Sequence, residues 1–87
     1  MKKLVIISAV WCPSCLILNK HLKKVQEEYT NIEFLKLDYD LDDEQVDAYH
    51  VGEKLPVMVM EDDNHHEIAR LVGEKSYDEI VRFIEEN

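Results

Sequence analysis

The chain holds two cysteines, and they lie three positions apart in the segment Trp11-Cys12-Pro13-Ser14-Cys15. A cysteine thiolate attacks disulfide bonds, and two cysteines on neighbouring positions of a helix are within the reach that a disulfide requires. A bridge across so short a loop constrains the unfolded chain little, so its structural value is small. The pair therefore predicts thiol–disulfide exchange in two steps: Cys12 attacks a partner disulfide, and Cys15 then attacks Cys12 and releases the reduced partner.

The segments on either side of the pair predict where the two sulfurs lie. Leu4–Ser8 is an apolar run with β-branched residues, typical of a strand buried on both faces of a sheet. Pro13 suits the first position of a helix, and the apolar residues that follow recur at helical spacing, which predicts a helix over residues 13–28. Unpaired N–H groups at the start of that helix favour a negative charge on Cys12. We expect Cys12 to be the exposed attacking residue and Cys15 the inward-facing one.

Two later helices are predicted from the residues at their ends. Asp42 with Gln45 and Ser76 with Glu79 have the spacing of a capping box, so each pair predicts the start of a helix. Gly52 is expected to end the first of these helices. The apolar residues that we expect the second one to bury are Tyr77, Ile80, Val81 and Ile84.

The remaining segments predict the strands of a single sheet. Glu33–Asp38 alternates polar and apolar residues, and Val57–Met60 and Glu67–Val72 flank a turn of Asp and Asn residues, so the last two predict a hairpin. Strand, helix and strand at the start of the chain form a right-handed unit with parallel strands. The predicted order is βαβαββα, an α/β fold with a mixed four-stranded sheet flanked by helices, in a single domain over residues 1–87.

Composition and charge narrow the classes of partner. The 87 residues carry 19 acidic and 10 basic side chains, a net charge of −9, which argues against nucleic acid because phosphate binding needs clustered Lys and Arg. Lys20, Lys23 and Lys24 form the only basic cluster, which we interpret as a solvated helix face. No apolar run is long enough to span a membrane, and the start of the chain is interpreted as a first strand rather than a signal peptide. We expect a cytoplasmic protein.

A zinc site is the main alternative for two cysteines at this spacing. Tetrahedral zinc needs four ligands, and the histidines that could complete the set are His21, His50, His65 and His66. His65 and His66 are adjacent in the predicted hairpin turn, so their side chains should diverge. We interpret the histidines as surface residues and expect neither a metal nor another cofactor.

Three features taken together resemble the thioredoxin family: Trp-Cys-Pro-Ser-Cys after an apolar strand, Leu55-Pro56 before the hairpin, and Val72-Gly73 before the last helix. The resemblance implies a thioredoxin-like fold, and a cis Pro56 that faces the Cys12 sulfur. It also implies that the Leu55 backbone pairs with a substrate strand. The residues that it implies for substrate binding are Trp11, Pro13, Ser14, Leu55, Pro56, Val72 and Gly73. The implied activity is reduction of protein disulfides by a monomer, with a reductant of the thioredoxin-reductase type or a small thiol.

The chain also departs from the thioredoxin pattern. It is shorter than full-length thioredoxins, and Ile6 stands where thioredoxins carry a buried aspartate that helps to deprotonate the second cysteine. The proton of Cys15 would then go to water or to Lys36. Two alternatives stay open: a glutaredoxin-like enzyme that uses glutathione, for which Leu55 offers no side-chain donor, and a non-enzymatic binding or redox-sensing module.

Overall fold

The computed structural model describes residues 1–87, and one sheet organises them. Its strands are β1 (Lys2–Ser8), β2 (Ile32–Asp38), β3 (Val57–Glu61) and β4 (Glu67–Val72), in the spatial order β2-β1-β3-β4. β1 pairs in parallel with β2 and antiparallel with β3, and β3 pairs antiparallel with β4. The predicted mixed four-stranded sheet is therefore confirmed.

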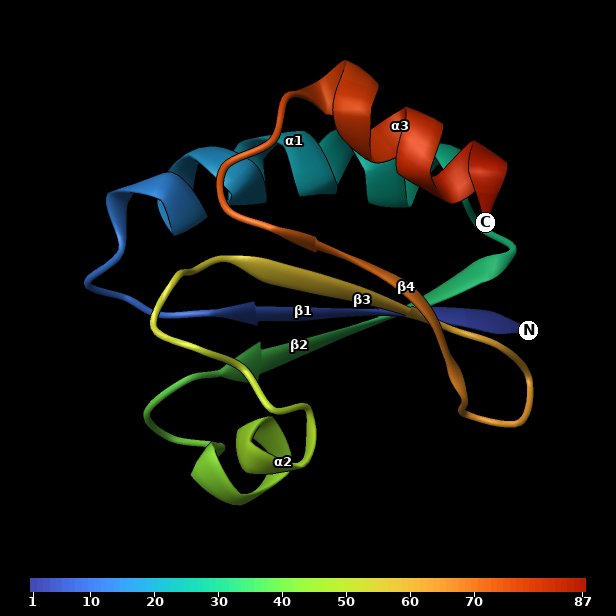
Figure 1. Ribbon diagram of the computed structural model, residues 1–87. Coiled ribbons are helices and arrows are strands. Elements are labelled where there is room, and N and C mark those ends of the chain that lie inside the picture. The colour runs from blue at the N-terminus through green and yellow to red at the C-terminus, as the bar shows by residue number, and fades with distance from the viewer.

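Three helices cover the two faces of the sheet. α1 (Pro13–Glu28) and α3 (Tyr77–Glu86) lie side by side on one face, and the short α2 (Asp43–Ala48) lies on the other (Figure 1). The predicted order βαβαββα is thus observed. None of these helices combines the length and the apolar character that crossing a membrane requires.

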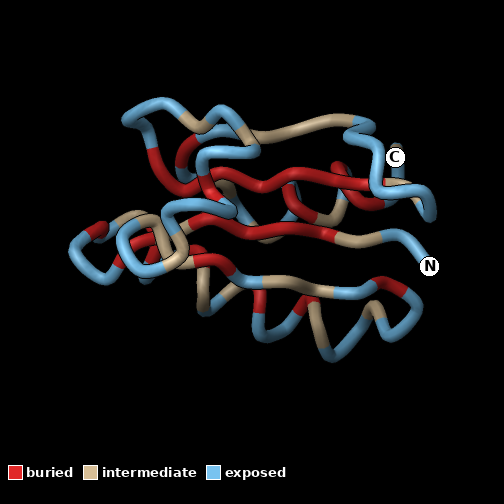
Figure 2. The backbone as a smooth tube through the Cα atoms, turned by 90° about the horizontal axis from the view of Figure 1, so that it is seen from below, coloured by how far each residue is buried: buried red, intermediate tan, exposed pale blue.

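The central strands carry the core. β1 and β3 are buried along most of their length, whereas the edge strands are buried only in part (Figure 2). Because side chains alternate across a sheet, Leu4 and Ile6 of β1 pack with α1 and α3, and Val5 and Ile7 pack on the face that α2 covers. Both cysteines belong to the cluster on the α2 side of the sheet.

The ends of α2 differ from the sequence prediction. The Asp42 carboxylate does not cap α2; instead it accepts a hydrogen bond of 2.8 Å from the backbone N–H of Asp38, which holds the exit from β2. His50, not Gly52, ends the helix: its φ is +53° and its N–H donates to the carbonyl of Asp47. Histidine is one of the few residues besides glycine that adopt this conformation readily, so the glycine rule pointed two positions too far.

The start of α3 was predicted correctly, and its buried face in part. Ser76 and Glu79 form the predicted capping box, with each side chain accepting from the backbone N–H of the other. Ile80 and Ile84 are buried as predicted, but Tyr77 and Val81 are only half-buried, and the helix buries Phe83 instead. A phenylalanine ring removes more apolar area from water than a valine side chain, and this favours the helix rotation that buries Phe83.

Candidate active site

Cys12 is the N-cap residue of α1, and three residues separate it from the carboxyl end of β1. Its backbone is extended, with φ −98° and ψ 110°, and Pro13 takes the first helical position. The Cys12 sulfur accepts a hydrogen bond of 3.3 Å from the backbone N–H of Cys15. This N–H is one of the donors that a helix start leaves without a partner, so the sulfur takes the place that a Ser or Asp side chain fills in other helices. The sulfur thus lies at the N-terminal end of the α1 dipole.

Cys12 is less accessible than the sequence predicted. Its exposed fraction is 6%, and that of Cys15 is 0%, so both thiols are buried and unbridged. The prediction of an exposed Cys12 was wrong because the loop before β3 lies against it: the Leu55 carbonyl is 3.9 Å from the Cys12 sulfur. The peptide bond between Leu55 and Pro56 is cis, as the family resemblance implied.

The surroundings of Cys15 oppose the loss of its proton. The pKa of Cys15 is raised to about 12, mainly by burial and secondly by the hydrogen bond with Cys12, while a backbone hydrogen bond with Ala9 acts in the opposite direction. The expected alternative of Lys36 as proton acceptor finds no support, since its side chain is exposed on β2 and no hydrogen bond joins it to the buried Cys15. At neutral pH, Cys15 is therefore held as a thiol.

Trp11 lies beside the pair and is anchored by residues that the sequence prediction did not include. Its side chain is 58% exposed, yet its indole N–H donates to Asp40 at 2.7 Å and its ring meets Tyr39 edge-on, with centroids 6.2 Å apart. The parallel register pairs Ser8 with Asp38, so the residues that follow β1 and β2 emerge at the same edge of the sheet. The signal for this contact in the sequence was the pair Tyr39 and Asp40, an aromatic and an acidic residue directly after the strand β2.

A backbone hydrogen bond joins two of the predicted substrate-binding residues, Pro56 and Gly73. The N–H of Gly73 donates to the Pro56 carbonyl at 2.8 Å, so the Val72-Gly73 turn and the loop before β3 form one wall next to Cys12. Gly73 has φ +91°, a region that favours glycine, and a Cβ there would lie 3.1 Å from Cε of Lys54. Among the predicted binding residues, Pro13 and Val72 are exposed and Ser14 is half-buried, whereas Leu55, Pro56 and Gly73 are buried. The loops before α1, β3 and α3, which carry these residues, lie at the same end of the molecule (Figure 1).

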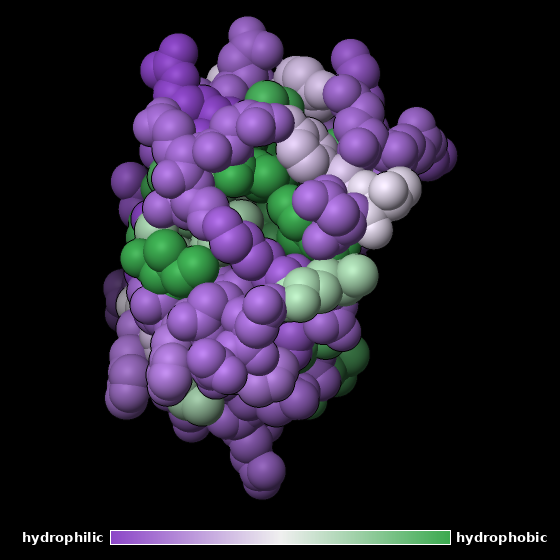
Figure 3. All heavy atoms as spheres, turned by 90° about the vertical axis from the view of Figure 1, so that its right-hand side faces the viewer, coloured by the Kyte–Doolittle hydropathy of each residue, from purple (hydrophilic) through white to green (hydrophobic).

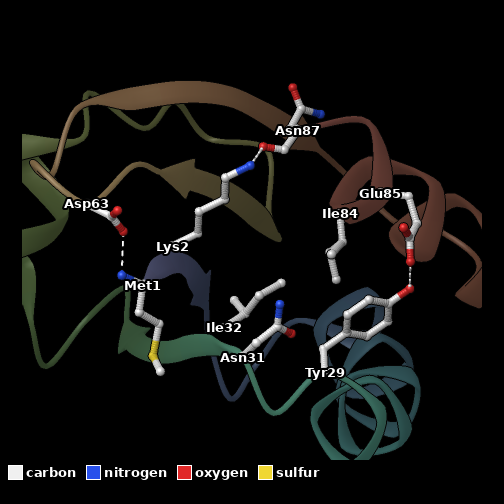
Figure 4. A pocket seen from close by; sticks show the side chains of 9 residues that line it. All are labelled: Met1, Lys2, Tyr29, Asn31, Ile32, Asp63, Ile84, Glu85 and Asn87. Atoms are coloured by element: carbon white, nitrogen blue, oxygen red, sulfur yellow. Dashed lines mark hydrogen bonds and ion pairs between the residues drawn. The ribbon is translucent and has the colours of Figure 1, made fainter.

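The largest hollow, of about 380 Å³, lies at the opposite end, near both termini (Figure 4). Its charged groups already have partners: the Met1 amine contacts Asp63, and Tyr29 contacts Glu85. This end is mainly hydrophilic, with apolar atoms visible between polar ones (Figure 3). It contains neither cysteine, so it is not part of the exchange site. No group of three or more His, Cys, Asp or Glu side chains is arranged to hold a metal ion.

Cys12 caps the start of a helix that follows a parallel strand, and Cys15 is buried one turn further along that helix. This arrangement defines a class of dithiol proteins with α/β folds. The thioredoxin family model matches residues 1–86, and the chain belongs to the thioredoxin family. Family membership and the two neighbouring cysteines support a thiol–disulfide oxidoreductase in general. Among curated proteins, no sequence matches the chain.

Solved structures show the same fold. Thioredoxin-2 of the malaria parasite, described as a component of that parasite's protein secretion machinery, is 23% identical, with a TM-score of 0.90 over 100% of this chain and 84% of its own. Mitochondrial thioredoxin 3 from Saccharomyces cerevisiae, in its oxidised form, is also 23% identical, with a TM-score of 0.88 over 99% of this chain and 78% of its own. At these identities the likeness shows the fold alone.

Proposed function

We propose that the protein reduces disulfide bonds in other proteins through the Cys12 and Cys15 thiols. The observation that carries this proposal is the position of Cys12 at the start of α1, where its sulfur accepts a hydrogen bond of 3.3 Å from the N–H of Cys15, the second thiol of the pair. Cys15, fully buried one turn further along α1, lies on the inner side of that sulfur and is shielded from other disulfides.

The exchange proceeds in two balanced steps. The Cys12 thiolate attacks one sulfur of the partner disulfide; a Cys12–partner disulfide forms and the second partner sulfur leaves as a thiolate. Cys15 then loses its proton to water and attacks the Cys12 sulfur, which forms the Cys12–Cys15 disulfide and releases the first partner sulfur as a thiolate. Two electrons pass to the partner. A reductant of the thioredoxin-reductase type, or a small thiol, returns two electrons to the pair.

Insulin reduction with dithiothreitol tests the proposal. The unaltered protein should accelerate the precipitation of insulin chains, and Cys12→Ser should reduce the rate to that of dithiothreitol alone. Cys15→Ser is the matched control, because it keeps the attacking sulfur and should accumulate a mixed disulfide visible on a non-reducing gel. Equal rates for the unaltered protein and Cys12→Ser contradict the proposal, and adducts that persist in Cys12→Ser contradict the assignment of the attacking residue.

A glutathione-dependent reaction is the second candidate, and Lys54 is the observation that favours it. Its side chain lies against Gly73 at the rim, where it could meet a glutathione carboxylate. Reduction of hydroxyethyl disulfide by glutathione separates the candidates. Turnover that falls in Lys54→Ala supports the glutathione reaction, whereas the proposed protein-disulfide reductase gives almost none.

A further inference from the structure

An apolar surface continues from the cysteine motif onto the outer face of α1. Half of the large hydrophobic side chains that the structure exposes lie within residues 10–17, namely Val10, Trp11, Leu16 and Ile17. Leu16 is 57% exposed and Ile17 is 45% exposed, although both lie in a helix whose other face supplies much of the core. Exposed apolar side chains gathered within eight residues of the chain differ from the singly scattered ones of an ordinary surface, and such groups mark interaction surfaces. We call these four residues the apolar strip.

Three unpaired cations follow the apolar strip along the same helix. Lys20, Lys23 and Lys24 are exposed, and the ion pairs of the structure involve none of them. Lys24 lies over the ring of Tyr77 at 4.5 Å. With a helical rise of 1.5 Å per residue, the three lysines lie about 12–18 Å from Cys12 along the axis of α1.

The charges on the other side of the cysteines have the opposite sign. Five acidic residues lie between residues 38 and 44, at the end of β2 and the start of α2: Asp38, Asp40, Asp42, Asp43 and Glu44. α1, which carries the three lysines, and α2 lie on opposite faces of the sheet (Figure 1). The acidic segment contacts the cysteine motif through the hydrogen bond of 2.7 Å from Trp11 to Asp40. In a chain with a net charge of −9, an acidic partner is repelled from most of the surface and attracted to the three lysines.

From this arrangement we infer that the outer face of α1 docks partner proteins that carry acidic side chains about 12–18 Å from the disulfide they present. Leu16 and Ile17 of the apolar strip lie between Cys12 and the lysines along α1, and the lysines set the orientation of the partner. The inference rests on the proposed disulfide exchange and adds to it the chemistry of the partner. Electrostatic steering of this kind acts mainly on the rate of association and weakens as salt is added.

Three synthetic disulfide peptides test the inference. Each carries the same cyclic disulfide and a flexible linker of about eight Gly and Ser residues, which spans about 16 Å on average. The linker ends in four Glu, four Gln or four Lys residues. The readout is the rate of reduction at limiting peptide concentration, with dithiothreitol regenerating the protein, at low salt and at 0.5 M NaCl.

We expect the Glu-tailed peptide to be reduced about fivefold or more faster than the Gln-tailed one at low salt, and less than about twofold faster at high salt. Lys20→Glu with Lys23→Glu should abolish this ratio. The matched control is Lys2→Glu with Lys36→Glu, two other exposed lysines whose reversal changes the net charge equally and should preserve the ratio. Thermal unfolding of both double variants checks that each is folded.

The outcomes separate this inference from the proposed function. Reduction of the Gln-tailed peptide without any preference for the Glu tail overturns the inference and leaves the exchange activity intact. A preference that both double variants lose equally also overturns it, because net charge alone would then explain it. Failure to reduce any peptide removes the proposed function. Self-association that Lys20→Glu with Lys23→Glu abolishes would assign the surface to a second copy of the chain, and would overturn the inference too.

Discussion

In the proposed exchange, the release of a reduced partner depends on how readily Cys15 loses its proton, and this step should respond steeply to pH. Burial, the largest cause, raises the pKa of Cys15 from 9.0 to about 12. The thiol predominates below that pKa, so at pH 7 about one molecule in 10⁵ carries the Cys15 thiolate, and each added pH unit increases that fraction about tenfold. A mixed disulfide on Cys12 removes the smaller contribution of the Cys12 thiol and leaves the effect of burial in place.

The step can be isolated with a chromogenic thiol. Thionitrobenzoate is attached to Cys12 as a mixed disulfide, and its release is followed by absorbance from pH 6 to pH 10. Because the attack by Cys15 is intramolecular, the rate is independent of protein concentration. We expect the logarithm of the rate to rise with a slope of about one across the range without a plateau, since only the thiolate attacks. In Cys15→Ser, the release should disappear.

A rate that levels off below about pH 9 would refute this reasoning, because Cys15 would then titrate no higher than an ordinary thiol. Such a plateau would indicate a base within reach of Cys15, in a site where Ile6 stands at the position of the thioredoxin aspartate. Dissociation of the label at the same rate in Cys15→Ser would show that water or a second molecule, and not Cys15, performs the step.

Three further substitutions test the frame around the site. Tyr49→Phe removes the hydrogen bond of 2.9 Å to Glu61, a carboxylate only 6% exposed, and should lower the free energy of unfolding by about 1–3 kcal/mol in urea denaturation; no loss would show that Glu61 finds another partner. Ser76→Ala breaks the capping box and should lower Tm by roughly 4–8 °C, as about 1 kcal/mol does in a domain of this size; an unchanged Tm in calorimetry would contradict the role of the cap. Gly73→Ala should lower the free energy of unfolding by about 1–3 kcal/mol, because residue 73 has a positive φ. Adding Lys54→Ala should recover only the part of that loss that comes from the contact between the new Cβ and Lys54. Full recovery in urea denaturation would show that φ is not the cause.

The sequence predicted the elements where a local rule and the tertiary packing agree. Pro13 at the first helical position and the apolar stripe that follows it gave α1 its observed bounds, and the reciprocal capping pair of Ser76 gave α3 its start. The pairing of Cys12 with the Cys15 N–H follows from the same rules, because a helix start always leaves donors to satisfy.

The prediction failed where a contact between distant segments decides. The burial of Cys12 depends on the Leu55 carbonyl, which lies 43 positions further along the chain. Glu61 is buried because the hydroxyl of Tyr49 reaches it from beyond α2, and nothing next to Glu61 in the sequence indicates this partner. Asp42 was assigned to a helix cap by its spacing, but the N–H of Asp38 competes for the same carboxylate.

In the proposed exchange, the low exposure of Cys12 limits the shape of the partner segment that carries the disulfide. Cys12 is only 6% exposed and the Leu55 carbonyl lies 3.9 Å from its sulfur, so we expect a disulfide set flat in a rigid surface to be hindered from reaching that sulfur. Only a disulfide on a protruding or locally unfolded segment can bring its sulfur in line. The protein would then reduce a recessed disulfide only after the protein that carries it has partly unfolded, and would leave the folded form intact.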